Sequence, residues 1–244
     1  MMRALGRWLL LLALACVGLQ LFFILRIAAM AWIAPESTSF QRSQAWQILK
    51  QQGQLPWRQD SVAFKAMSTN LQRAVIASED SAFTQHHGIW WQSLEKAWEK
   101  NARAKAQAEK RAQRQPDKPV DVKIVGGSTI TQQLAKNLFL SGERTLLRKG
   151  QEMVLALTLE ALLSKERILE IYLNSVEWGE GVFGAEAAAQ HYFRKSAARL
   201  NAWEAARLAV MLPRPRYFEK LAQSAYLARR AETIMARMND VVLP

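Results

Sequence analysis

The chain has 244 residues, half of them hydrophobic, and a formal charge of +12 from 33 basic and 21 acidic residues. This length allows one domain of moderate size or two small ones, and so many apolar residues exclude a disordered chain. The positive charge predicts a polyanionic partner, which is nucleic acid, an anionic membrane surface or a phosphate-bearing substrate. The single cysteine, Cys16, excludes an intramolecular disulfide and a thiolate metal cluster.

The first predicted element is a transmembrane anchor at residues 8–33. Its apolar run of 18 residues, 8–25, has Gln20 as its only polar member and corresponds to about 27 Å of helix. The two arginines within residues 1–7 predict that this end is cytoplasmic and that the rest of the chain is exported. A domain outside the cytoplasm excludes nucleic acid as the partner. A cleaved signal peptide is the alternative, although its apolar region is normally shorter.

Behind the anchor, the composition predicts a connector and then one helical domain. Residues 34–66 mix proline, serine and glutamine, which predicts a membrane-proximal connector with one short helix. Residues 67–244 show helical periodicity nearly everywhere and no clear strand alternation, so we expect an all-α fold. Within them, the segment 95–123 has nine basic and five acidic residues and predicts a solvated helix followed by a mobile loop. Contact with anionic lipid headgroups is the alternative for this segment.

The first candidate catalytic residue is Glu79. Leu71, Val75 and Ile76 mark the inner face of a predicted helix, and Glu79 falls on the same face. Burial raises the pKa of a carboxyl group, which suits a general base. Asp80 follows it as a capping or orienting group. A buried glutamate paired with an arginine remains the structural alternative.

Two neighbouring histidines, His86 and His87, raise the question of a metal site. The chain has only His191 besides them, and no other ligand stands at metal-binding spacing. We therefore expect a structural, hydrogen-bonding histidine.

The stretch "GGSTITQQLAKNLFL" from Gly126 predicts a helix with an anion-binding start. Ser128 or Thr129 can cap it, and Gln132 completes a Thr-x-x-Gln capping box. Free N–H groups at a glycine-led helix start bind anions, and Lys136 extends the positive field. The apolar stripe of this helix consists of Ile130, Leu134 and Leu138. A well-capped surface helix is the alternative, but it does not explain the paired glutamines.

A third segment places Arg148, Lys149 and Glu152 within one helical turn. The ten residues that follow are almost wholly apolar, which indicates a buried helix, so these charges should line a cleft. A simple ion pair between Arg148 and Glu152 is the alternative, and it leaves Lys149 unexplained.

Taken together, these motifs resemble the glycosyltransferase family that polymerises peptidoglycan, in its membrane-anchored monofunctional form. Five family motifs occur in order between Leu71 and Pro215. The matched positions are Glu79, Asp80, Phe83, His86 and Gly88; Gly126 through Asn137; Arg148, Lys149 and Glu152; Ile168 through Asn174; and, more loosely, Glu204, Ala205, Leu208 and Ala209. Trp90 stands where relatives often carry aspartate, and the basic segment before Gly126 is longer than usual.

The resemblance implies a lysozyme-like, two-lobed helical fold, with 67–244 as the catalytic domain. It implies lipid II as substrate, polymerised with inversion into a β-1,4 glycan and with release of polyprenyl pyrophosphate. Glu79 and Glu152 would be catalytic, the first as the general base and the second to orient a cation or hold a divalent metal. The implied substrate-binding residues are Asp80, Ser128, Thr131, Gln132, Gln133, Lys136, Asn137, Arg148 and Lys149.

Cofactors, partners and location follow from the same resemblance. A divalent cation, Mg²⁺ or Mn²⁺, is the candidate cofactor, with Glu152 as its candidate ligand, and no organic cofactor is expected. The expected partners are lipid II, the growing lipid-linked glycan, the membrane and other cell-wall synthesis or division proteins. The protein would be a single-pass protein of the bacterial inner membrane with its catalytic domain on the periplasmic side.

Two other functions fit parts of the pattern. A lysozyme-like lytic enzyme also uses a cleft glutamate, but it has no pyrophosphate for Lys136, Arg148 and Lys149 to bind. A non-catalytic, membrane-anchored scaffold for envelope proteins is the second alternative. "SLEK", Ser93 to Lys96, matches the Ser-x-x-Lys motif of transpeptidases by chance, because no Lys-Thr-Gly follows it.

Overall fold

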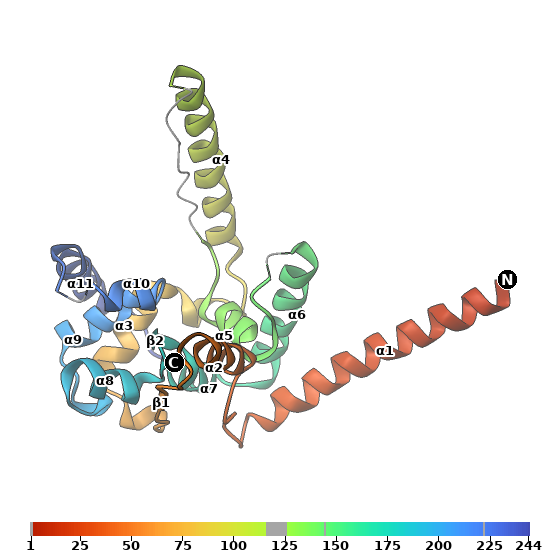
Figure 1. Ribbon diagram of the computed structural model, residues 1–244, viewed down its shortest axis with the longest axis horizontal. Coiled ribbons are helices and arrows are strands. Elements are labelled where there is room, and N and C mark those ends of the chain that lie inside the picture. Colours follow the sequence, from red (N-terminus) through yellow and green to blue (C-terminus); the bar gives the residue numbers. More distant parts are fainter. Residues whose placement is uncertain (1, 116–125, 144, 222) are drawn as a thin grey trace.

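The computed structural model describes residues 2–115, 126–143, 145–221 and 223–244, and these residues are mostly helical (Figure 1). The all-α fold class predicted from the periodicity is confirmed. The helices are α1 (Met2–Ala29), α2 (Ser39–Gln52), α3 (Thr69–Glu79), α4 (Trp91–Arg114), α5 (Ile130–Phe139), α6 (Leu146–Leu162), α7 (Lys165–Ser175), α8 (Ala185–Phe193), α9 (Ala202–Met211), α10 (Pro215–Glu219) and α11 (Ala225–Met238). The short elements are the strands β1 (Arg58–Gln59), β2 (Glu177–Gly179) and β3 (Val182–Phe183) and the 3₁₀ turns η1 (Phe64–Ala66), η2 (Phe83–Gln85) and η3 (Ala197–Arg199).

Two groups of helices form the body behind α1. Helices α3, α9 and α11 pack on one another, and α5 packs on α2, α6 and α7 (Figure 1). The side chains of Leu71, Val75 and Ile76 are buried, which confirms the predicted inner face of α3. Each such side chain contributes about 1.5–3 kcal/mol through burial. This packing fixes the position of α3, whose last residue, Glu79, contacts α5.

Helix α5 begins with the capping box that its sequence predicts. The Thr129 hydroxyl accepts the N–H of Gln132, and the Gln132 side chain accepts the N–H of Thr129. Ile130, Leu134 and Leu138 are buried, as predicted for the apolar stripe. The two contacts satisfy donors that a helix start leaves unpaired, so the first turn of α5 is well defined.

Residues 34–66, expected as a connector, contain α2 and β1. Helix α2 packs on α5, and β1 pairs in parallel with β3, whose other neighbour is the antiparallel β2. Gly181, in the turn between β2 and β3, has φ +71°, and a Cβ there would lie 2.0 Å from the carbonyl oxygen of Pro56. Only glycine fits this position. The structure thus packs much of the predicted connector into the body.

Helix α1 is the one described helix that is long and apolar enough to cross a membrane, over Leu5–Ala29. It ends at Ala29, four residues before the predicted end of the anchor at 33, because the chain tightens there into three-residue turns. Its last turns contact the body: the Gln20 and Gln151 amides exchange hydrogen bonds of 3.2 and 3.4 Å. The ring centroids of Phe23 and Phe139 lie 5.3 Å apart.

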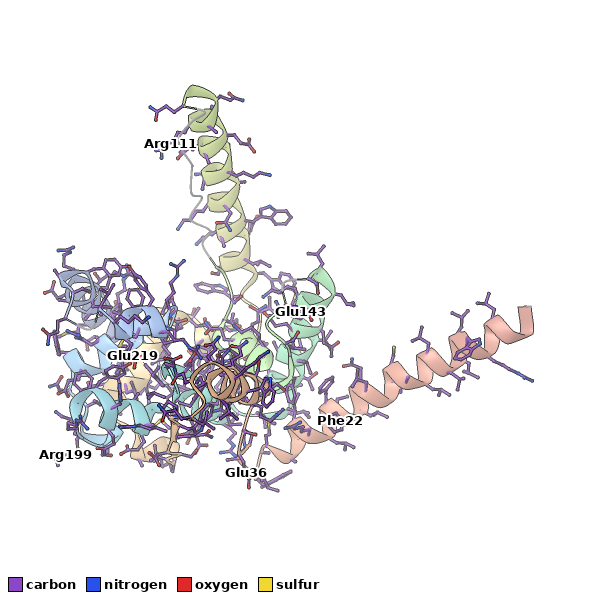
Figure 2. All side chains as sticks on the ribbon, in the orientation of Figure 1. Phe22, Glu36, Arg111, Glu143, Arg199 and Glu219 are labelled. Carbon is purple, nitrogen blue, oxygen red and sulfur yellow. The ribbon has the colours of Figure 1, made fainter. Side chains whose placement is uncertain are left out.

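Helix α4 extends away from the body (Figure 1). It confirms the predicted helix in the basic segment 95–123 and ends at Arg114. The mobile loop predicted for the end of that segment lies largely outside the described residues, because 116–125 are not among them. Figure 2 shows Arg111 near the far end of α4.

Candidate active site

Glu79 is the last residue of α3, and its carboxylate faces α5. The Gln133 amide nitrogen donates a hydrogen bond of 2.9 Å to Glu79 Oε2. Burial raises the pKa of Glu79 above the usual value of a glutamate, while the hydrogen bond from Gln133 lowers it in part. The predicted raised pKa is confirmed. The carboxylate is therefore held in one place and binds a proton more readily than a free glutamate does.

Gln133 is oriented from behind by Tyr172 of α7. The Tyr172 hydroxyl donates a hydrogen bond of 3.0 Å to Gln133 Oε1, so the amide NH₂ group points to Glu79. Burial raises the pKa of Tyr172 well above that of a free tyrosine, so the hydroxyl keeps its proton. The paired glutamines thus have different tasks: Gln132 caps α5, as the sequence predicts, and Gln133 holds Glu79.

Asp80 ties the end of α3 to the start of α5. Its side chain is only 1 % exposed. Oδ2 accepts the Ile130 N–H at 3.0 Å, and both oxygens lie 3.0 Å from His86 Nε2. His86 is the structural, hydrogen-bonding histidine that the sequence predicts. Asp80 acts as the predicted orienting group, since it fixes the first turn of α5 beside Glu79.

A cavity of about 310 Å³ opens between α5, α6 and the start of α2. It is lined by Phe40, Ser128, Gln133, Lys136, Asn137, Leu140, Ser141, Gly142, Glu143, Arg148, Lys149 and Glu152. Seven of the eleven predicted site residues are among them. Gln133 both lines this cavity and binds Glu79, so it connects the cavity to the candidate base.

The other four predicted residues lie beside the cavity or beneath it. Glu79 and Asp80 are described above, and Gln132 is buried in the capping box. Thr131 is fully buried and donates a hydrogen bond of 2.5 Å to Glu160, which also pairs with Lys165 at 2.8 Å. Thr131 and Gln132 therefore position α5 within the body.

Two cations share the Glu152 carboxylate at the cavity wall. Glu152 is 3 % exposed, and Arg148 Nη1 lies 2.7 Å from its Oε2. Lys149 Nζ contacts the other oxygen and lies 3.2 Å from Ser128 Oγ. A buried carboxylate is stable only when it is paired, so Glu152 holds both cations in place. One carboxylate against two cations leaves net positive charge.

Lys136 adds a third cation, which has no side-chain partner among the described residues. Part of the Lys136 side chain is exposed to solvent, but the neighbouring cavity walls partly desolvate its ammonium group. This desolvation lowers the pKa of Lys136, Glu152 opposes the shift, and Arg148 and Lys149 add to it. The Nε of Arg148 is a second donor without a partner in the described part of the chain. The cavity therefore offers charge and donors to an anion.

The same contacts argue against a resident divalent cation at Glu152. Both of its oxygens are taken by Arg148 and Lys149. Among residues 2–115, 126–143, 145–221 and 223–244, no group of three histidine, cysteine or acidic side chains could hold a metal ion. The donor set at Glu152 therefore does not fit a metal centre.

Comparison with known proteins assigns the family. The transglycosylase family model matches residues 47–239. The chain belongs to the transglycosylase family. It is 51 % identical over 244 residues to the biosynthetic peptidoglycan transglycosylase of Herminiimonas arsenicoxydans, covering 100 % of this chain and 99 % of that one. It is also 49 % identical to the protein of the same name from Burkholderia thailandensis, with 99 % and 90 % covered, and 50 % identical to that from Janthinobacterium sp. (strain Marseille), with 93 % and 91 % covered.

Sequence reasoning missed two residues at this transglycosylase site. Tyr172 lies in the matched motif from Ile168 through Asn174 but is not among the predicted site residues, although a hydroxyl within this apolar stretch signals a buried polar contact. Phe40 lines the cavity from the predicted connector, and no local pattern indicates that contact. The family match likewise begins at residue 47, before the predicted domain start at 67.

Proposed function

We propose that this transglycosylase polymerises lipid II into linear β-1,4 glycan strands and releases polyprenyl pyrophosphate. The observation that carries the proposal is the pairing of a proton-accepting carboxylate with a cationic cavity through one side chain, Gln133. A glycosyl transfer with a pyrophosphate leaving group needs both parts. The family membership and the names of the relatives support the same reaction.

In the proposed reaction, Glu79 removes the proton from the 4-hydroxyl group of the acceptor sugar. The oxygen then attacks the anomeric carbon of the growing chain, and the bond from that carbon to the pyrophosphate oxygen breaks. The electron pair leaves with the polyprenyl pyrophosphate, and attack from the opposite face inverts an α-linked donor to a β-linked product. A positioned general base contributes about 10²- to 10⁴-fold in rate.

The cations stabilise the departing pyrophosphate. Lys136 supplies a charge that no described carboxylate neutralises by an ion pair, and Arg148 and Lys149 supply donors held in place by Glu152. Charge-assisted hydrogen bonds to phosphate oxygens are about twice as strong as neutral ones. Ser128 and Asn137 complete the cavity wall at the start and the middle of α5. Asp80, Thr131 and Gln132 contribute by positioning α5.

The proposed arrangement in the cell follows from α1. Residues 1–7 are cytoplasmic, the helix crosses the inner membrane once, and the catalytic domain works on the periplasmic side. The apolar anchor keeps the cavity near a substrate that is itself lipid-linked. The proposed partners are lipid II and the growing glycan in the membrane, together with other cell-wall synthesis or division proteins.

Incubation of the purified full-length protein with fluorescent lipid II in detergent or proteoliposomes tests the proposal. We expect a polymer that a muramidase digests to disaccharide units. Shortening of finished glycan without new polymer would indicate a lytic enzyme and contradict the proposal. No reaction with either substrate would favour a non-catalytic scaffold.

A further inference from the structure

Helix α2 packs on the body through one face, and Gln44 is the polar residue in the middle of that face. Phe40, Gln44 and Ile48 are spaced four residues apart, so they follow one another along the same side of the helix. The ring centroids of Phe40 and Phe183 lie 6.3 Å apart. Ile48 is fully buried, and its Cδ1 atom lies 3.9 Å from the position that a Cβ at Gly181 would occupy. The two ends of this face therefore pack on β3 and on the turn before it.

Arg216 of α10 makes the polar contact at the middle of this face. Its Nη2 atom donates a hydrogen bond to Gln44 Oε1, and its Nε atom donates one of 2.7 Å to Glu177 Oε1 in β2. Glu177 is 7 % exposed, and a carboxylate that is buried to this extent is stable only when it is paired. Arg216 Nη1 also lies 3.9 Å from Glu180 Oε1. The guanidinium group is thus held by β2 and presents another donor to α2.

This contact connects the two groups of helices in the body. Helix α10 follows α9, which packs on α3, whereas α2 packs on α5. Near the end of α9, the Ala209 carbonyl oxygen accepts a hydrogen bond of 3.4 Å from Ser78, the neighbour of the candidate base Glu79. The hydrogen bond from Arg216 to Gln44 therefore joins the group that carries Glu79 to the group that carries the cations of the cavity.

The position of α2 matters to the cavity because of Phe40. This residue is the one aromatic side chain among the described residues that line the cavity, and it lies one turn before Gln44. Its ring gives part of the wall an apolar surface in the cavity that also holds the three cations. An apolar wall keeps water from the cations, and attraction between opposite charges is stronger where water is excluded. Displacement of Phe40 should therefore weaken the binding of an anion in the cavity.

We propose that Arg216 is a positioning residue for substrate binding. By joining α10 and β2 to Gln44, it holds α2 in place and keeps Phe40 in the cavity wall. Arg216 acts through α2, since it is not among the described residues that line the cavity. This inference rests on the proposed function, because the anion whose binding it affects is the pyrophosphate of lipid II.

Gln44→Leu tests the proposal with the least disturbance to the fold. The substitution removes the acceptor on α2 and leaves the ion pair between Arg216 and Glu177 in place, so the protein should fold. The loss of one hydrogen bond changes an equilibrium constant about 3- to 10-fold. We expect the KM for lipid II in proteoliposomes to rise by this factor. The value of kcat should stay within about twofold of the parent, because Glu79 and Gln133 are unchanged.

Two further variants of α2 separate positioning from a general loss of packing. Gln44→Glu keeps an oxygen acceptor for Arg216 and should retain the KM of the parent. Gln47→Leu makes the same change as Gln44→Leu at an exposed residue of the same helix, and it should also leave KM unchanged.

Arg216→Met tests the same contact from the other side. We expect it to raise KM, and the double variant with Gln44→Leu should raise KM no further, because both substitutions remove one shared hydrogen bond. Lys195→Met is the matched control. It breaks an ion pair with Glu204 whose cation is exposed to the same degree as Arg216, at 33 % against 34 %, and it should leave KM unchanged.

Amide hydrogen exchange of the full-length protein reports on α2 without any substrate. Peptides from α2 should exchange about 3- to 10-fold faster in Gln44→Leu and Arg216→Met than in the parent, and at the parent rate in Gln47→Leu. Peptides from α6 should exchange at the parent rate in all three variants.

Unchanged exchange of α2 in both Gln44→Leu and Arg216→Met would overturn the proposal, as would faster exchange with an unchanged KM. An equal rise of KM in Gln47→Leu would also contradict it. A parent protein that does not polymerise lipid II would contradict the proposed function, whereas the exchange of α2 would still decide whether Arg216 holds this helix.

Discussion

Glu79 determines how the stability of the domain should respond to pH. Burial raises its pKa in the folded state, so the ionised carboxylate costs folding free energy above that pKa and costs nothing below the unfolded value of about 4.5. Glu79→Gln removes the charge and keeps an acceptor for Gln133. We expect the variant to have a higher melting temperature than the parent at pH 7–8, with the difference vanishing as the pH falls towards 4.5. A variant less stable by the same amount at every pH would contradict the assigned burial.

Lys136 should set the alkaline limit of activity. Its pKa is lowered, first by desolvation, so the cation that stabilises the leaving group is lost at a pH below that of free lysine titration. Lys136→Arg keeps the charge at all accessible pH values. We expect the fall of the polymerisation rate at alkaline pH to begin at a higher pH in this variant than in the parent. Lys195→Arg is the control, because Lys195 forms an ion pair with Glu204, and it should not change the pH at which the rate falls.

Tyr172 should act through Gln133 on the pKa of Glu79. Tyr172→Phe removes one hydrogen bond, which contributes about 0.5–1.5 kcal/mol, so we expect about a 3- to 10-fold loss of kcat. Without this hydrogen bond, Gln133 stabilises the Glu79 carboxylate less, which raises the pKa of Glu79. The fall of the rate at acid pH should therefore begin at a higher pH. Tyr192→Phe removes the hydroxyl that binds the Trp178 carbonyl oxygen and serves as the matched control. If Tyr172→Phe lowered kcat but left the acid side of the pH profile unchanged, Tyr172 would contribute only by packing and not through the pKa of Glu79.

At the scale of elements, the start of α5 joins stability to substrate binding. Thr129 caps the helix and also donates a hydrogen bond of 2.6 Å to the Gly88 carbonyl oxygen. Thr129→Ala should cost about 1–2 kcal/mol in unfolding free energy and raise the KM for lipid II. Asn201→Ala removes the corresponding cap of α9, far along the chain from the cavity, and should lower stability without changing KM.

The elements that the sequence predicts well are those with local causes. Apolar periodicity predicts the inner face of α3, and the four-residue Thr-x-x-Gln motif predicts the capping box of α5. Arg148 and Glu152 stand four residues apart, so their ion pair follows from helix geometry alone. Each of these depends on residues within one or two turns of one another.

The features that the sequence does not reveal depend on distant segments. Tyr172 and Gln133, which form a hydrogen bond, are 39 positions apart in the chain. Strands β1 and β3 pair although each has only two residues. Such short strands carry too few residues for an alternating pattern. Phe40 reaches the cavity because α2 packs on α5, a contact that no local motif encodes.

At the scale of the whole molecule, α1 and the body form one connected unit. Gln20, the only polar residue within the apolar run, exchanges amide hydrogen bonds with Gln151 of α6, so neither amide is left unpaired. Helix α6 also carries Arg148, Lys149 and Glu152, which line the cavity. Helix α1 therefore packs on the same helix that holds Arg148 and Lys149 at the cavity.

The most direct measurement compares lipid II polymerisation by the parent and by Glu79→Gln in the same proteoliposomes. If Glu79 is the general base, initial rates should fall about 10²- to 10⁴-fold, while binding of lipid II persists because the cations remain. Glu232→Gln, an exposed glutamate on α11, should polymerise like the parent. A Glu79→Gln variant that polymerises as fast as the parent would contradict the assigned role of Glu79.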